Sequence, residues 1–140
     1  MCIIIDANAA HHLNAEDPAG ALVLGWLLKG KGKLVVSQDN LKELFKTKFK
    51  DVILSLDQAR RVCRADEEKC NDLRDKFTDK SILSSDDPHV VALVVVSKCD
   101  LVFTHDQPLH EDLKNKAVVP GGCGIFQKAT HRHMLGECNC

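Results

Sequence analysis

Residues 85–106 read SDDPHVVALVVVSKCDLVFTHD, and this stretch decides the fold that the sequence predicts. Asp87 and Pro88 are typical of a helix start, because aspartate is a preferred N-cap and proline suits the first helical position. An almost wholly apolar helix follows, and a turn at residues 98–100 leads into a short buried strand, Leu101–Thr104. In an open α/β sheet, helix starts and the carboxyl ends of strands meet at one crevice. We therefore expect Asp87 and Asp106 to lie close together there.

The remaining chain also alternates short strands with helices. Cys2–Ile5 and Leu34–Val36 are short apolar runs, typical of strands that are buried on both faces. Asp17 and Pro18 open an apolar helix between them, and a last strand is expected at Ala117–Val119. This alternation predicts an α/β fold, a three-layer α/β/α sandwich with a central parallel sheet of about four or five strands.

Leu56–Phe77 has the pattern of one long amphipathic helix. Leu56, Cys63, Cys70 and Phe77 recur every seven residues, which places them on one apolar stripe. We therefore expect Cys63 and Cys70 to be buried free thiols that face the core.

Length and composition narrow the class of protein. A chain of 140 residues suits one domain, and no apolar run approaches the roughly 20 residues that a membrane helix requires. The start, MCIIID, lacks the charged region of a signal peptide, so we expect a cytoplasmic protein. Seven cysteines are an odd number, and reduced thiols are the expectation in that compartment.

Charge gives only a local hint of a nucleic-acid partner. The formal net charge is −1, so no global field attracts phosphates. Lysines nevertheless gather in the first half of the chain, and Lys46, Lys48 and Lys50 follow one predicted helix. They form either a phosphate-binding face or an ordinary solvated surface.

Four acids are candidates for chemistry, and each also has an ordinary explanation. Asp6 directly follows a buried strand and has no helix to cap for several residues. Asp87 fits an N-cap directly before a proline, as Asp17 does, and Asp106 fits an N-cap before Gln107-Pro108. Glu43 projects away from the apolar face of its helix, which favours a solvent-exposed side chain.

Three segments carry a resemblance to a known family: IIIDAN at residues 3–8, LVVSQDNLKELF at residues 34–45, and SDDPHVVALVVVSKCDLVFTHDQPLHEDL at residues 85–113. Together they resemble a PIN-domain nuclease, the family that includes the toxin nucleases of bacterial toxin–antitoxin pairs. The similarity spans roughly Cys2 to Asp112. Its most specific parts are the Asp-Pro-His-apolar block and the Thr-x-Asp-x-x-Leu pattern.

The resemblance implies a site and a reaction. It places the family's four metal-binding acids on Asp6, Glu43, Asp87 and Asp106, with Asn8, Thr104 and Asp112 as accessory positions. A family helix of this kind turns its polar face into the crevice, which brings Glu43 back into consideration. Carboxylates are hard ligands that suit Mg²⁺ or Mn²⁺. The implied function is therefore a metal-dependent nuclease, with RNA as the expected substrate and DNA not excluded.

The resemblance also implies partners and domain limits. A small antitoxin protein and a second copy of the chain are the partners that it allows. Residues 1–120 would form the nuclease domain and residues 121–140 a C-terminal extension. The long predicted helix and the tail after Pro120 depart from the family's short toxins.

Other functions stay open at this stage. A phosphotransfer domain of the haloacid-dehalogenase type wants a second aspartate where Asn8 stands, and a receiver domain wants paired acids at the first strand. A non-catalytic PIN-like module that binds RNA is the third alternative. The tail residues His131, His133, Cys138 and Cys140 are of the types that bind zinc, but their spacing is not that of a common finger.

Overall fold

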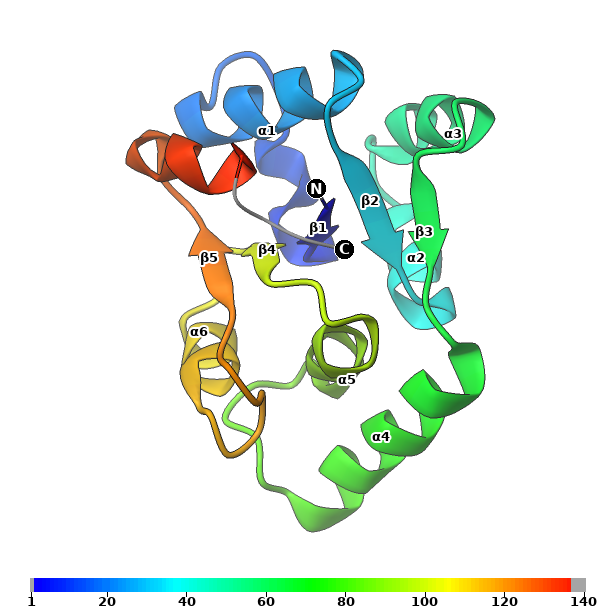
Figure 1. Ribbon diagram of the computed structural model, residues 1–140, viewed down its shortest axis with the longest axis vertical. Coiled ribbons are helices and arrows are strands. Elements are labelled where there is room, and N and C mark those ends of the chain that lie inside the picture. Colours follow the sequence, from blue (N-terminus) through cyan, green and yellow to red (C-terminus); the bar gives the residue numbers. More distant parts are fainter. Residues whose placement is uncertain (1, 137–140) are drawn as a thin grey trace.

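The computed structural model describes residues 2–136, and a five-stranded parallel sheet lies at its centre (Figure 1). The order in the sheet is β3-β2-β1-β4-β5, and every pair of neighbours is parallel. The strands are β1 (Cys2–Ile5), β2 (Lys33–Val36), β3 (Val62–Arg64), β4 (Leu101–Phe103) and β5 (Gly124–Phe126). The predicted α/β fold with a central parallel sheet is confirmed.

Helices cover both faces of the sheet. They are η1 (Ala7–His12), α1 (Pro18–Leu28), α2 (Gln38–Leu44), α3 (Lys50–Gln58), α4 (Glu67–Lys80), α5 (Pro88–Ser97), α6 (Gln107–Lys114) and η2 (Ala129–Gly136). In Figure 1, α1, α3 and η2 lie on one side of the sheet, and α4, α5 and α6 lie on the other. The result is the three-layer arrangement that alternating apolar strands and helices predict.

Strand β1 supplies both cores. Ile3 and Ile5 belong to the hydrophobic cluster that η1, α1 and α3 cover, whereas Cys2 and Ile4 belong to the cluster beneath α4, α5 and α6. All four residues are fully buried, as expected for a central strand with side chains pointing alternately to opposite faces. Burying each isoleucine contributes about 1.5–3 kcal/mol relative to an exposed side chain.

The predicted long helix over Leu56–Phe77 is wrong. The chain leaves α3 through Arg60, which has a left-handed backbone (φ 58°), and then forms β3, which pairs with β2. The seven-residue recurrence therefore crosses three different elements. Cys70 is buried in α4, but Cys63 lies in the edge strand β3 and is only half-buried. Both are free thiols, so the expectation of full burial fails for Cys63 alone.

The last strand is also displaced from its predicted place. Residues 117–119 form turns, because the amides of Val118 and Val119 both donate to the carbonyl of Asn115 at 2.9 and 2.8 Å. The strand that extends the sheet is β5, followed by η2 beside α1 (Figure 1). Both of these elements fall within residues 121–140.

Cysteine chemistry differs from the expectation at one position. Cys63, Cys70 and Cys123 are free thiols, but Cys2 is disulfide-bonded. An odd cysteine count does not reveal which sulfurs folding brings together, so the expectation of reduced thiols is wrong for Cys2. Within residues 2–136, no helix is long and apolar enough to cross a membrane.

The connectivity of the sheet defines where a site belongs. From β1 the chain builds outward through β2 to β3, and it then returns to place β4 on the other side of β1. The order of the strands thus reverses between β1 and β4. In open α/β sheets, ligands bind outside the carboxyl ends of the strands at such a switch point.

Candidate active site

Asp6 lies at the carboxyl end of β1, directly at the switch point. Its side chain is almost fully buried, with 1% of the residue exposed. One carboxylate oxygen accepts a hydrogen bond from the amide of Asn8 at 3.2 Å, and the other accepts one from the hydroxyl of Thr104 at 2.8 Å. The pKa of Asp6 is raised, chiefly by burial and also by the nearby charge of Asp106. The two hydrogen bonds act in the opposite direction.

Thr104 connects the ends of the two central strands. It follows β4, is fully buried, and its hydroxyl also accepts a hydrogen bond of 3.1 Å from the amide of Asp106. The carbonyl of Thr104 lies 3.1 Å from Nε2 of His110 in α6. The hydroxyl and the carbonyl of Thr104 are therefore both hydrogen-bonded, and Thr104 fixes Asp6 relative to the start of α6.

Asp87 and Asp106 stand next to each other at the starts of α5 and α6. Desolvation raises the pKa of Asp87 to about 6, and the charge of Asp6 and a side-chain hydrogen bond with Asp106 act in the same direction. In the described chain, neither Asp87 nor Asp106 caps its helix with a side-chain hydrogen bond. Asp17, by contrast, accepts a hydrogen bond of 2.9 Å from the amide of Gly20.

Glu43 reaches the other acids through His89. Its residue is exposed, as the helical pattern predicts, but one carboxylate oxygen lies 3.0 Å from Nε2 of His89 in α5. His89 in turn lowers the pKa values of both Asp6 and Asp87, so it lies among the acids. Asp6, Asp87 and Asp106 thus lie within electrostatic range of one another, and Glu43 contacts His89.

Two residues that the sequence did not single out hold this arrangement. His89 bridges α2 and α5, and its signal in the sequence is its place directly after Asp87-Pro88. Asn40 is fully buried, and its side-chain amide donates to the carbonyl of Ile5 at 3.0 Å. Because Asn40 precedes Glu43 by three residues, the two lie on one face of α2. This hydrogen bond therefore directs the Glu43 face toward the end of β1.

The accessory positions differ in their surroundings. Asp112 is buried, and its two carboxylate oxygens accept hydrogen bonds from the amides of Ser84 and Ser85 at 2.7 and 2.9 Å. It therefore holds the segment that leads into α5. Asn8 is exposed, and its backbone amide donates to Asp6.

A groove of about 730 Å³ lies between η1 and the segment that follows α2. It is bounded by η1, starting at Ala7, and by the segment after α2 that includes Lys46 and Lys48. Both lysines are exposed. Lys50 does not line this groove, and its ammonium lies 6.0 Å from the centroid of the Phe45 ring. The groove therefore presents two cationic side chains together with Glu16, and none of the four candidate acids lines it.

The tail residues that the sequence offers as zinc ligands lack support for that chemistry. Nδ1 of His131 accepts hydrogen bonds from the amides of Gln127 and Lys128 at 3.1 and 3.2 Å, and Cys138 and Cys140 lie outside the described residues. Burial raises the pKa of the Cys123 thiol, which keeps it protonated and unsuited to act as a nucleophile.

Comparisons with known proteins identify no family. No protein-family model matches the chain, and no curated protein matches it. Among solved structures, it is similar to the crystal structure of VapBC2 from Rickettsia felis bound to a DNA fragment from their promoter, with 17% sequence identity and a TM-score of 0.48. The match covers 89% of this chain and 97% of that chain.

Proposed function

We propose that the protein is a metal-dependent nuclease that hydrolyses phosphodiester bonds, with RNA as its substrate. The observation that carries this proposal is the group formed by Asp6, Asp87 and Asp106 at the switch point, in which the pKa of Asp87 is raised to about 6. These acids are 19 or more positions apart along the chain, and the influence of each on the pKa of another supports the proposal. Strongly perturbed acids in such a place favour a functional site.

The ordinary explanation for these acids is weak. An aspartate before a proline normally caps the helix, and Asp17 does so in this chain. Asp87 has the same sequence context and Asp106 stands two residues before Pro108, but within the described chain their side chains do not cap. Their carboxylates face other carboxylates, which is unfavourable unless a cation is bound between them.

The donor set fits a hard divalent cation. Asp6, Asp87 and Asp106 would hold Mg²⁺ or Mn²⁺, and Glu43 stands beside them through His89. When bound, such a cation lowers the pKa of a water molecule and neutralises charge on the phosphodiester. The protein's own residues orient this group: Thr104 fixes Asp6, Asn40 directs α2, and Asp112 holds the entry to α5.

The groove between η1 and the segment after α2 supports a nucleic-acid substrate. Lys46 and Lys48 line it and would pair with backbone phosphates on either side of the bond to be cleaved. An extended single strand suits a channel with cationic walls better than a rigid duplex does. The small antitoxin protein and the homodimer that the resemblance implies stay predictions.

Cleavage assays with and without metal test the proposal. Labelled pools of single-stranded RNA and of DNA are incubated with the protein in Mg²⁺, in Mn²⁺ and in excess EDTA. We expect cleavage of RNA in either metal, loss of cleavage in EDTA, and recovery when Mn²⁺ is added back. Full activity in excess EDTA would exclude metal-dependent hydrolysis. Cleavage of DNA alone would leave the chemistry intact and overturn the assignment of RNA.

A further inference from the structure

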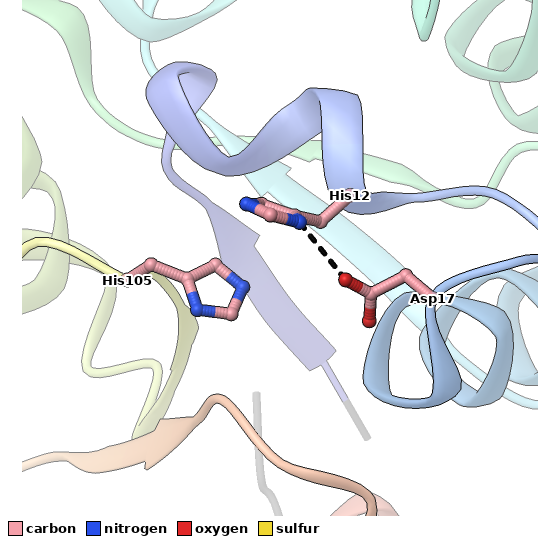
Figure 2. A group of neighbouring side chains, drawn as sticks. All are labelled: His12, Asp17 and His105. Atoms are coloured by element: carbon pink, nitrogen blue, oxygen red, sulfur yellow. Dashed lines mark hydrogen bonds and ion pairs between the residues drawn. The ribbon is translucent and has the colours of Figure 1, made fainter.

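A second group of metal-binding side chains lies near the acids. It consists of His12 at the end of η1, Asp17 before α1, and His105 after β4 (Figure 2). Each residue offers a ligand atom, and these atoms all lie within 4.8 Å of one another. His105 stands between Thr104 and Asp106 in the chain, but its ring packs edge-on against Phe103, with ring centroids 5.4 Å apart. Phe103 belongs to the core cluster shared with η1 and α1, so this group lies on that side of the sheet.

One nitrogen of the group is buried and has no hydrogen-bond partner among the described residues. Nε2 of His105 is buried, and among the described residues it is one of two buried side-chain polar atoms without a hydrogen-bond partner. Figure 2 shows a ring nitrogen of His105 directed toward the space between His12 and Asp17. Leaving a buried polar atom unpaired costs about 1–3 kcal/mol. A ligand in that space would satisfy this nitrogen.

The other two residues are held in place by their surroundings. Nδ1 of His12 lies 2.9 Å from Oδ2 of Asp17, and the other oxygen of Asp17 accepts from the amide of Gly20 at 2.9 Å. A Cβ atom at residue 20 would overlap the carbonyl oxygen of His12, so glycine permits α1 to approach η1 this closely. The side chain of Asn14 accepts from the amide of Asp17 at 3.0 Å and fixes the connecting loop. His12 and Asp17 are thus held in fixed positions where η1 packs against the start of α1.

We propose that His12, Asp17 and His105 form a binding site for a transition-metal cation of the Zn²⁺ class, separate from the carboxylate group. Two imidazoles and one carboxylate are a ligand set that zinc prefers, whereas Mg²⁺ prefers oxygen ligands alone. Three protein ligands leave a fourth tetrahedral position for water. With bonds of about 2.0–2.2 Å, ligand atoms around tetrahedral zinc lie roughly 3.3–3.6 Å apart. The observed separations, from 2.9 Å to at most 4.8 Å, bracket that value and need only small side-chain movements.

Occupation of this site would tie three parts of the fold together. It would join the end of η1, the start of α1 and the segment that carries Thr104 and Asp106. The expected consequence is a higher melting temperature of the whole chain in Zn²⁺, because a ligand that binds only the folded state stabilises it. This consequence does not depend on nuclease activity.

Titration of the full-length protein with Zn²⁺, after removal of bound metal by a chelator, tests the proposal. The measurements are calorimetric affinity and melting temperature, and Asp6→Asn serves as the background because it weakens binding at the carboxylates. In that background we expect His105→Ala and His12→Gln to weaken Zn²⁺ binding at least about 100-fold and to abolish the rise in melting temperature. Co²⁺ should give visible absorption typical of tetrahedral ligation in the background protein, and both variants should lose it.

Two histidine variants are matched controls. His11 stacks on His12, with ring centroids 4.0 Å apart, but does not belong to the group, so His11→Ala should change the affinity by less than about threefold. His133→Ala tests the C-terminal segment as the source of binding. Unchanged Zn²⁺ affinity in both His105→Ala and His12→Gln would overturn the proposal. A loss confined to His133→Ala would also overturn it. Because His12→Gln keeps a polar side chain, it remains informative if His105→Ala fails to fold.

Discussion

The hydroxyl of Thr104 donates a 2.8 Å hydrogen bond to the carboxylate of Asp6, across 98 positions of sequence. The same oxygen accepts from the amide of Asp106 at 3.1 Å. One fully buried hydroxyl therefore sets the positions of two of the acids. Since β1 and β4 are neighbours in the sheet, this hydrogen bond joins their carboxyl ends at the switch point.

Replacing Thr104 by valine should separate positioning from folding. Thr104→Val keeps the shape and leaves a buried carboxylate oxygen without its donor, so we expect a loss of about 2–4 kcal/mol in the free energy of unfolding. RNA cleavage should fall about 10–100-fold, and Mn²⁺ affinity should fall with it. Thr104→Ser retains the hydroxyl and should restore Mn²⁺ affinity to within about threefold. Wild-type Mn²⁺ affinity in Thr104→Val would refute this role.

Asp6→Asn should abolish cleavage while the fold remains intact. The change hardly alters volume, and the anionic oxygen that a hard cation prefers is lost. The amide oxygen can accept from Thr104 or from the amide of Asn8 but not from both, so we expect some loss of stability without unfolding. Asp72→Asn on the exposed surface of α4 removes the same charge far from the site and should leave activity unchanged. Cleavage rates and melting temperatures of the three proteins are compared. If Asp6→Asn cleaves RNA at the wild-type rate, the acids do not carry the reaction.

The pKa of Asp87 predicts how stability depends on pH without metal. Its pKa is about 6 in the folded protein and 3.8 ordinarily, so above about pH 4 the folded state binds this proton more tightly than the unfolded state. The stability that Asp87 contributes is therefore complete below about pH 4 and is lost as the pH rises through about 6. Allowing for partial solvent screening, we expect a loss of about 1–2 kcal/mol.

Urea unfolding in EDTA at several pH values measures this loss. Asp87→Asn cannot ionise, so it should be more stable than the wild type at pH 7.5 and should show less of the decline. Added Mg²⁺ at pH 7.5 should recover stability in the wild type but not in the variant. A wild-type protein that becomes more stable, relative to Asp87→Asn, between pH 4 and 7 would contradict the assignment.

The parallel sheet was predictable because its central strands have a recognisable sequence pattern. Cys2–Ile5 and Leu101–Phe103 are continuous apolar runs, and only a strand covered on both faces tolerates them in a short segment. Strand β3 was not predictable in the same way. It has three residues at the edge of the sheet, so little of it is buried and its composition carries no signal. The seven-residue spacing of Cys63 and Cys70 then produced, by chance, the pattern of an amphipathic helix.

The site was predictable only where backbone position determines it. Asp6, Asp87 and Asp106 stand at element ends, and the topology alone brings these ends together. The pairing of Glu43 with His89 depends on how α2 is rotated, and the hydrogen bond of Asn40 to Ile5 sets that rotation. The group of His12, Asp17 and His105 depends on the close approach that Gly20 permits. Side-chain contacts of this kind leave no periodic pattern in a sequence.

Asp112 should prove important for stability more than for metal binding. Asparagine offers one acceptor oxygen where the carboxylate offers two, so Asp112→Asn turns an amide group toward a backbone N–H. We expect a loss of about 2–4 kcal/mol in the free energy of unfolding and less than about a threefold change in Mn²⁺ affinity. Glu111→Gln, its exposed neighbour, is the matched control. A large loss of Mn²⁺ affinity with unchanged stability would show that Asp112 serves the cation directly.

The groove between η1 and the segment after α2 predicts how RNA binding depends on salt. Lys46 and Lys48 line it and are exposed, so replacing both by glutamine should weaken RNA binding most at low ionic strength. If each contacts one phosphate of a single strand, the slope of log affinity against log salt should decrease by about 1.4. The double variant Lys76→Gln, Lys80→Gln removes the same charge from α4, on the opposite side of the sheet, and should leave the slope unchanged. Binding is measured with catalytically inactive Asp6→Asn as the background, so that cleavage does not interfere. Equal slopes for the two double variants would show that the groove does not hold the RNA backbone.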